Sequence, residues 1–189
     1  MMRQNRDLRK EKLSREVALP KGVTATLNVN TITVKGPKGE VSKEFKFHSS
    51  NVKITDGKIT FEAPKTTKRT KKIVGSLVAH LKNMVRGSQE AHKYVLKICS
   101  GHFPMNVAVA GNKLVVKNFL GEKVPRSMIL KHGAEVKVDG EHINVTSASK
   151  ETAGQVSADI EQLTRRPGFD TRVFQDGIYI ITKDGEDLK

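Results

Sequence analysis

The chain carries the same series of turn and strand signals twice, and this repetition limits the folds it can adopt more than any other feature. The corresponding segments are Val34-Lys35-Gly36 with Val116-Lys117-Asn118, Gly39-Glu40 with Gly121-Glu122, Asp56-Gly57 with Asp139-Gly140, and Gly87 with Gly168. The pairs occur in one order, and their offset stays between 81 and 83 residues. Markers that recur in order at a nearly constant spacing indicate an internal duplication.

The first copy combines short strands with one helix. Runs of β-branched residues alternate with turn pairs from Val23 to Glu62, which predicts strands and hairpins, one of them through the turn Gly36-Pro37-Lys38-Gly39. That turn lacks the spacing and the following helix of a phosphate-binding loop. Apolar residues then recur at three- and four-residue spacing from Ile73 to Val85, which predicts a helix that is capped by Gly87.

The second copy repeats this order. Strands are predicted at Asn112 to Lys117, Lys123 to Leu130, Glu135 to Val138 and His142 to Thr146, the last two joined as a hairpin through Asp139-Gly140. A helix follows, with Val156, Ile160 and Leu163 as its apolar stripe and Ser149 as its N-cap. An apolar strand from Tyr94 to Ile98 links the two copies.

The pattern predicts an α+β fold of two tandem duplicated small domains, each an antiparallel or mixed β-sheet packed with one main α-helix. The length of 189 residues accommodates two such domains. The predicted boundaries are a basic N-terminal arm at 1–16, a first repeat at 17–92, a second repeat at 93–183 that starts with the interdomain strand, and a frayed C-terminal end at 184–189.

Basic residues exceed acidic ones and are concentrated in the first half of the chain. The sequence holds 34 Lys and Arg against 20 Asp and Glu, a formal net charge of +14. Residues before Val95 contribute +13 of this charge, largely through the N-terminal arm and the run from Lys65 to Lys72. A charge this far above zero indicates a polyanionic partner such as nucleic acid.

The composition also argues against other classes of protein. No stretch reaches the roughly 18 apolar residues of a membrane span, and the polar first fifteen residues do not form a secretory signal. The single cysteine, Cys99, excludes an internal disulfide and fits a reducing compartment. We therefore expect a cytoplasmic protein.

Motifs in both halves resemble the sixth large-subunit ribosomal protein family, in its archaeal and eukaryotic cytosolic form. The motifs are Val34-Lys35-Gly36-Pro37-Lys38-Gly39, His102-Phe103-Pro104-Met105-Asn106-Val107, Asn118-Phe119-Leu120-Gly121-Glu122-Lys123, and Arg172-Val173-Phe174-Gln175-Asp176-Gly177-Ile178-Tyr179-Ile180. The resemblance covers about Val17 to Lys183. It implies a duplicated α+β protein that binds large-subunit rRNA near the region where translation factors act, beside neighbouring ribosomal proteins and without catalysis.

The closing motif departs from the family pattern at two positions. Phe169 stands where the family usually has a basic residue, and Arg166 stands where an aliphatic residue is typical. Pro167-Gly168 follows Arg166 directly. The resemblance therefore leaves the geometry of this loop open.

Four cations lie at the start of the first predicted helix: Lys68, Arg69, Lys71 and Lys72. The helix dipole disfavours positive charge at this end by about 0.3–1 kcal/mol each. Two interpretations stay open, a solvated helix start or a cluster that neutralises RNA phosphates.

The candidate RNA contacts of the second half are more scattered: Lys117, Lys123, Arg126, Lys150, Arg165, Arg166 and Arg172. The helix dipole favours Arg165 and Arg166 without any ligand, and Lys117 and Lys123 fit ordinary strand-edge charge as well as RNA contact. Aromatic residues make up only 5% of the chain, which does not predict a base-stacking platform. Phe103 and Phe119 fit packing at a domain interface.

The sequence predicts no catalytic site, cofactor, metal site or small-molecule substrate. Cys99 and His102 have a metal-like spacing, but a second ligand pair is missing. The expected function is that of a structural constituent of the large ribosomal subunit that binds rRNA through Lys and Arg contacts to phosphate. The alternatives are a free RNA-binding or RNA-chaperone factor with the same fold, and an enzyme that uses the cleft between the repeats.

Overall fold

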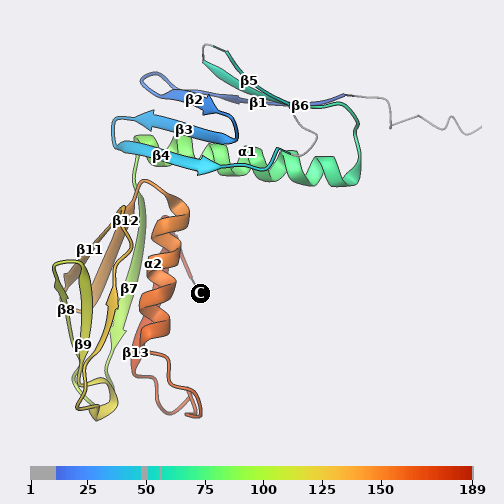
Figure 1. Cartoon of the computed structure of the whole chain (residues 1–189). Helices are drawn as coiled ribbons and strands as arrows, with labels where there is room; N and C mark the ends of the chain where they lie inside the picture. Colours follow the sequence, from blue (N-terminus) through green and yellow to red (C-terminus); the bar gives the residue numbers. More distant parts are fainter. Residues whose placement is uncertain (1–11, 48–50, 56, 189) are drawn as a thin grey trace, which may run out of the picture. The chain divides into compact units, whose positions relative to one another are not determined.

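The chain forms two compact units, Met1–Glu90 (unit 1) and Ala91–Lys189 (unit 2) (Figure 1). The computed structural model describes residues 12–47, 51–55 and 57–188. Each unit combines antiparallel sheets with one long helix, as the sequence predicts. In both units, however, the strands form two separate sheets rather than one.

Unit 1 holds six strands and one helix in its described residues. They are β1 (Leu13–Ala18), β2 (Thr24–Asn28), β3 (Thr31–Gly36), β4 (Gly39–Glu44), β5 (Asn51–Thr55), β6 (Lys58–Ala63) and α1 (Lys68–Gln89). One sheet has the order β2-β3-β4 and the other β1-β6-β5. The helix contacts β1, β3, β4 and β6, so it packs on strands of both sheets.

The core of unit 1 lies between α1 and these sheets. Alternate residues of β6, such as Ile59 and Phe61, are completely buried, as expected for a strand with one face toward a core. The helix supplies Val74, Leu77 and Leu81, which recur at the spacing of one helix face. Each fully buried side chain of this size contributes about 1.5–3 kcal/mol of transfer free energy.

Unit 2 holds eight strands, a short 3₁₀ segment and one helix in its described residues. They are β7 (His92–Cys99), β8 (Asn106–Ala110), β9 (Lys113–Lys117), η1 (Phe119–Gly121), β10 (Arg126–Ile129), β11 (Ala134–Asp139), β12 (His142–Ser147), α2 (Lys150–Leu163), β13 (Gly177–Lys183) and β14 (Glu186–Asp187). The sheets have the orders β8-β9-β10 and β11-β12-β7-β13-β14.

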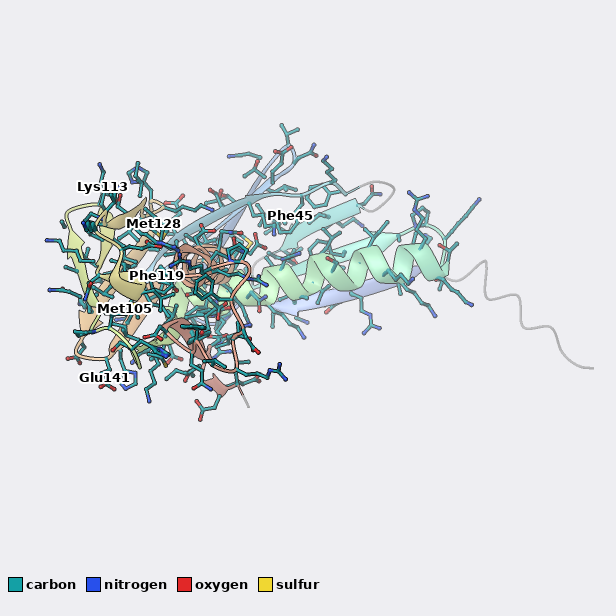
Figure 2. The ribbon with its side chains drawn as sticks, turned by 90° about the horizontal axis from the view of Figure 1, so that it is seen from below. Phe45, Met105, Lys113, Phe119, Met128 and Glu141 are labelled. Atoms are coloured by element: carbon teal, nitrogen blue, oxygen red, sulfur yellow. The ribbon has the colours of Figure 1, made fainter. Side chains whose placement is uncertain are left out.

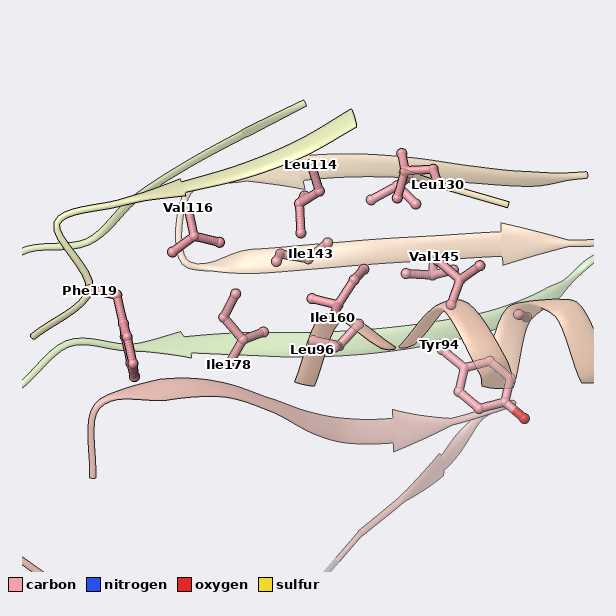
Figure 3. Packing of buried hydrophobic residues seen from close by; sticks show 13 residues of the cluster. Tyr94, Leu96, Leu114, Val116, Phe119, Leu130, Ile143, Val145, Ile160 and Ile178 are labelled. Carbon is pink, nitrogen blue, oxygen red and sulfur yellow. The ribbon is translucent and has the colours of Figure 1, made fainter. Parts of the chain in front are cut away.

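The core of unit 2 joins both sheets to α2. Figure 3 shows Leu114 and Val116 of β9, Ile143 of β12 and Ile160 of α2 among the side chains that fill it, and all four are completely buried. Ser149 caps α2, because its Oγ accepts a hydrogen bond from the Thr152 amide at 3.3 Å. The predicted N-cap is therefore confirmed.

The two units repeat one element order. In unit 1 the chain runs β1 to β6 and then α1, and in unit 2 it runs β7 to β12 and then α2. The pairing also corresponds, since β1 lies beside β6 as β7 lies beside β12. Unit 2 adds β13 and β14, which extend the sheet on the free side of β7. The linking strand predicted from Tyr94 to Ile98 is thus an inner strand of unit 2.

Residues near both predicted chain ends take part in strand pairing. Leu13–Ala18 forms β1 in register with β6, so the part of the N-terminal arm from Leu13 to Glu16 belongs to the fold. Residues 1–11 lie outside the described part. The end predicted to fray instead contains β14, paired with β13, and Asp184, whose side chain is only 8% exposed. Strand pairing and ion pairs bind this segment to the sheet.

Two further predictions differ from the structure. Gly87 does not cap α1, because the helix continues to Gln89 and the Glu90 amide donates to the Arg86 carbonyl. Phe119 is not an interface residue, because it is 1% exposed and belongs to the core of unit 2 (Figure 2). The end of α1 and the burial of Phe119 could not be read from the local sequence, because both depend on tertiary packing.

Candidate nucleic-acid interface

The first turn of α1 presents four cations on a capped helix end. Thr67 and Thr70 form a reciprocal capping box: the Thr70 amide donates to Thr67 Oγ1 at 3.1 Å, and the Thr67 amide donates to Thr70 Oγ1 at 2.8 Å. These two threonines satisfy backbone donors without any carboxylate, and the first turn contains no acidic residue. The helix therefore begins stably although its dipole disfavours nearby cations.

The side chains of this first-turn cluster are free of carboxylate partners within the described part of the chain. Lys68, Arg69, Lys71 and Lys72 are all exposed. Figure 2 shows nitrogen-tipped side chains around the end of α1 where the chain enters the helix. The same exposed helix face continues through the short side chains of Ser76 and Ala79 to Lys82. This face can approach a polyanion closely.

Arg126, the first residue of β10, connects Glu122 to the end of α2 through hydrogen bonds. Its Nε and Nη2 donate to the two carboxylate oxygens of Glu122 at 2.7 and 2.6 Å. Its Nη1 donates to the Leu163 carbonyl at 2.8 Å and to the Arg165 carbonyl at 3.3 Å. The guanidinium also lies 4.4 Å from the centre of the Phe119 ring. Most of its donors are therefore occupied inside the protein.

Glu122 is the carboxylate that fixes this arginine. The side-chain hydrogen bond from Arg126 lowers the pKa of Glu122 below its usual value; partial burial opposes this, and the charges of Arg126 and Arg166 add to it. Bidentate pairing of this kind fixes orientation as well as charge. Arg126 therefore positions the loops around it and is poorly placed to bind phosphate.

Five cations lie at or soon after the ends of β9, η1 and α2, and we call them the basic end of unit 2: Lys117, Lys123, Arg165, Arg166 and Arg172. Lys117, Lys123 and Arg165 are exposed and have no carboxylate partner among the described residues. Arg166 lies 3.8 Å from Glu122, and Arg172 pairs with Asp170 at 2.9 Å while its side chain stays 88% exposed. The pairing with Arg172 lowers the pKa of Asp170.

Lys150 is not part of this group. It opens α2 at the other end of the helix, and 14 helical residues span about 20 Å. Its ammonium group lies 3.2 Å from Asp184, whose other carboxylate oxygen contacts Nδ1 of the fully buried His92 at 2.9 Å. Lys150 therefore binds the C-terminal segment to the start of α2.

The sequence did not predict a row of planar side chains beside the basic end. The rings of His102 and Phe174 stack at 5.1 Å, and Phe169 meets Phe174 edge-on at 5.0 Å. The Arg166 guanidinium lies 4.4 Å from the centre of the Phe169 ring. The sequence signals for this row were the two departures from the family motif, Phe169 and Arg166.

Other kinds of site have little support in the described ranges. No group of three or more His, Cys, Asp and Glu side chains there is arranged to hold a metal ion. No helix in those ranges is long and apolar enough to cross a membrane. The site with the clearest chemical character is therefore the pair of basic surfaces.

Comparison with known proteins identifies the family. The model of the family "Ribosomal protein L6" matches the chain twice, at residues 19–91 and 103–177. The large ribosomal subunit protein uL6 of Methanosarcina mazei is 40% identical over 173 residues, covering 92% of this chain and 98% of the relative. The uL6 protein of Methanocella arvoryzae is 43% identical over 170 residues, covering 89% and 96%. That of Natronomonas pharaonis is 42% identical over 174 residues, covering 92% and 98%.

These matches confirm both the resemblance seen in the motifs and the internal duplication, since one family model fits each half of the chain. These three relatives are archaeal, one of the two forms that the resemblance named, and the alignments span almost their whole length. A chain with two matches to this model and archaeal relatives about 40% identical to it belongs to the ribosomal protein L6 family, uL6.

Proposed function

We propose that this protein is a structural component of the large ribosomal subunit that docks on rRNA through two basic surfaces, the first-turn cluster of α1 and the basic end of unit 2. The observation that carries the proposal is the set of cations at these two places, most of which are exposed and have no carboxylate partner among the described residues. Membership of the uL6 family makes the role structural and non-enzymatic.

The two surfaces act by electrostatic docking. Each Lys or Arg that neutralises a phosphate releases condensed counterions, which favours binding and makes it depend on salt. These contacts position the protein on RNA but do not read its sequence. Arg126 contributes indirectly, because its hydrogen bonds to Leu163 and Glu122 keep Arg165 and Lys123 on neighbouring loops.

We further propose where on the large subunit the protein docks. The family resemblance supports a site near the region where translation factors act, with other ribosomal proteins as neighbours. The charge distribution supports RNA as the main partner, because the net charge of +14 is far from the balance of an ordinary globular surface.

The salt dependence of binding to large-subunit rRNA tests the role of the first-turn cluster. Replacing Lys68, Arg69, Lys71 and Lys72 by Ala should reduce the log-log slope of affinity against salt by about one for each phosphate that is no longer neutralised. The control replaces Lys21, Lys53, Lys58 and Lys137, four exposed lysines on other parts of the fold, and should change the slope less. If the two variants had equal salt slopes, the first-turn cluster would not be part of the RNA interface.

Sedimentation separates the ribosomal role from that of a free RNA-binding or RNA-chaperone factor. A ribosomal constituent should stay on the large subunit, at a fixed ratio, through a high-salt sucrose gradient. Recovery at the top of the gradient, above intact subunits, would support the free factor instead.

A further inference from the structure

We propose that the row of planar side chains in unit 2, Arg166, Phe169, Phe174 and His102, is a stacking site for an unpaired RNA base. We call this row the stacking ladder. The inference rests on the proposed function and deepens it, because it adds a contact to single-stranded RNA to the contacts with phosphate. Base stacking is the usual way in which proteins hold splayed-out RNA bases.

The geometry of the ladder is that of a continuous row of planar groups. The Arg166 guanidinium lies over the Phe169 ring at 4.4 Å, Phe169 meets Phe174 edge-on at 5.0 Å, and Phe174 stacks on His102 at 5.1 Å with 30° between the planes. The two ends of the ladder are thus a guanidinium and an imidazole. Both groups stack on nucleobases.

The ladder is accessible in unit 2. Phe169 keeps 39% of its surface exposed, and the side chain of His102 keeps 41%. Leaving a phenylalanine ring in water forgoes part of the burial free energy that the core gains elsewhere. A partly exposed aromatic row that two loops nevertheless hold in order is suited to a partner with a flat apolar face.

His102 is held in place by a buried carboxylate. The Asp176 side chain is 1% exposed and accepts hydrogen bonds from both the backbone amide and Nδ1 of His102, the first at 2.9 Å. Burial acts to raise the pKa of Asp176, but the hydrogen bonds and charge of His102, with the Gly101 amide, outweigh it and lower that pKa. An ionised Asp176 only accepts hydrogen bonds, so Nδ1 carries the proton and Nε2 is left for a ligand.

The charges around the ladder favour RNA over an apolar protein segment. Arg165 is exposed next to Arg166, and Arg172 lies in the same loop with 88% of its side chain exposed. Phosphates on either side of a stacked base would meet these cations. An apolar protein surface would instead have to desolvate Arg165, which has no carboxylate partner among the described residues, without compensation.

Binding of a short single-stranded RNA that carries one fluorescent adenine analogue, 2-aminopurine, tests the proposal in the full-length chain. Stacking should quench the analogue in the complex. Replacing Phe169 by Ala should weaken binding by about five- to 160-fold and relieve the quenching, because stacking on an aromatic side chain is worth about that much per base. The salt slope should stay unchanged, since no charge is removed.

Two further variants make the result specific. Phe103→Ala removes another exposed phenylalanine of unit 2 that is outside the ladder, and should leave binding and quenching near wild type. Phe169→Trp keeps an aromatic face and should retain both. Circular dichroism and thermal melting check that each variant is folded.

The outcomes separate this inference from the function on which it rests. Equal effects of Phe169→Ala and Phe103→Ala, or quenching that survives Phe169→Ala, would overturn the stacking site while salt-dependent binding to rRNA still supported the docking function. If Phe169→Ala left RNA binding unchanged but released the protein from assembled subunits, the ladder would bind a protein neighbour, and the inference would be wrong. Absence of any salt-dependent binding to rRNA would refute the proposed function itself.

Discussion

At the scale of single residues, Gly36 shows why one motif of the sequence needs a glycine. The turn between β3 and β4 lies against the end of α1, where the Lys38 amide donates to the Ser88 carbonyl at 2.9 Å. A Cβ atom at Gly36 would lie 2.6 Å from that carbonyl oxygen and 2.9 Å from the Ser88 Cβ. These are backbone and short side-chain atoms that cannot move away easily. The glycine thus permits close packing rather than a phosphate contact.

Gly36→Ala should therefore destabilise unit 1 by about 1–3 kcal/mol, the usual cost of overpacking a closely fitted site. Denaturant unfolding measures the effect. The matched control is Gly75→Ala in the exposed part of α1, where nothing lies within 4 Å of the added atom. Alanine should stabilise the helix there by up to about 1 kcal/mol. If Gly36→Ala left the free energy of unfolding unchanged, the turn between β3 and β4 would be able to move away from Ser88.

At the scale of secondary-structure elements, Arg126 connects the strand that contains it to the end of a helix. A helix leaves its last carbonyls without partners, and Arg126 donates to one of them, the Leu163 carbonyl. Its planar guanidinium also donates hydrogen bonds to both carboxylate oxygens of Glu122. A lysine has a single ammonium group and cannot reproduce both sets of bonds.

Arg126→Lys should consequently lower the free energy of unfolding of unit 2 nearly as much as Arg126→Ala does, by about 1.5–3 kcal/mol for the charged hydrogen bonds that neither variant can form. Thermal unfolding of both variants measures this. Lys123→Ala, on the neighbouring exposed loop position, is the control and should stay within about 0.5 kcal/mol of wild type. A stable Arg126→Lys protein would mean that charge alone suffices at this position.

The same pair predicts how stability depends on pH. The folded state lowers the pKa of Glu122, mainly through its hydrogen bond with Arg126, so the pair stabilises the fold above the unfolded-state value of 4.5. This contribution is lost as the pH falls below that value and through the folded-state pKa. Glu122→Gln should therefore flatten the loss of stability in acid relative to wild type, as measured by denaturant unfolding at a series of pH values. If the free energies of unfolding of wild type and Glu122→Gln fell in parallel with pH, Glu122 would not be the source of this acid dependence.

The elements also show what local sequence could predict. Hairpins such as the one between β11 and β12, the apolar stripes of both helices and the cap at Ser149 depend on neighbours within a few residues, and the structure has them where the patterns placed them. The bonds from Arg126 to Leu163 and from His102 to Asp176 join residues far apart in the chain. No periodicity encodes such pairs, so the contacts that join the loops and build the stacking ladder could not be predicted, although Phe169 and Arg166 stood out as departures from the family motif.

At the scale of the whole molecule, the two units are alike in element order but differ in how they present their cations. Both present cations, yet those of unit 1 follow one helix end, whereas those of unit 2 stand on loops held together by Arg126. Unit 2 also has the additional strands β13 and β14 beside β7. Most of the net charge belongs to unit 1, whereas unit 2 is nearly balanced, so in the proposed function unit 1 would supply long-range attraction to RNA and unit 2 would supply local contacts.

Each unit has its own hydrophobic core, so we predict that the full-length chain unfolds in two separate thermal transitions. Ile59 of β6 and Ile143 of β12 occupy corresponding places in the two copies, and both are completely buried. Replacing either by Val should cost about 0.5–1.5 kcal/mol. For domains of this size, about 1 kcal/mol lowers the midpoint by roughly 4–8 °C.

Differential scanning calorimetry should then show that Ile59→Val lowers only the transition of unit 1 and that Ile143→Val lowers only that of unit 2. The two variants control for each other, because they remove the same methylene group from corresponding sites. If both variants shifted one common transition by the same amount, the two units would unfold as one cooperative body. The two cores would then belong to one cooperative folding unit. The boundary near Glu90 would separate two compact units in the structure, but not two units that unfold independently.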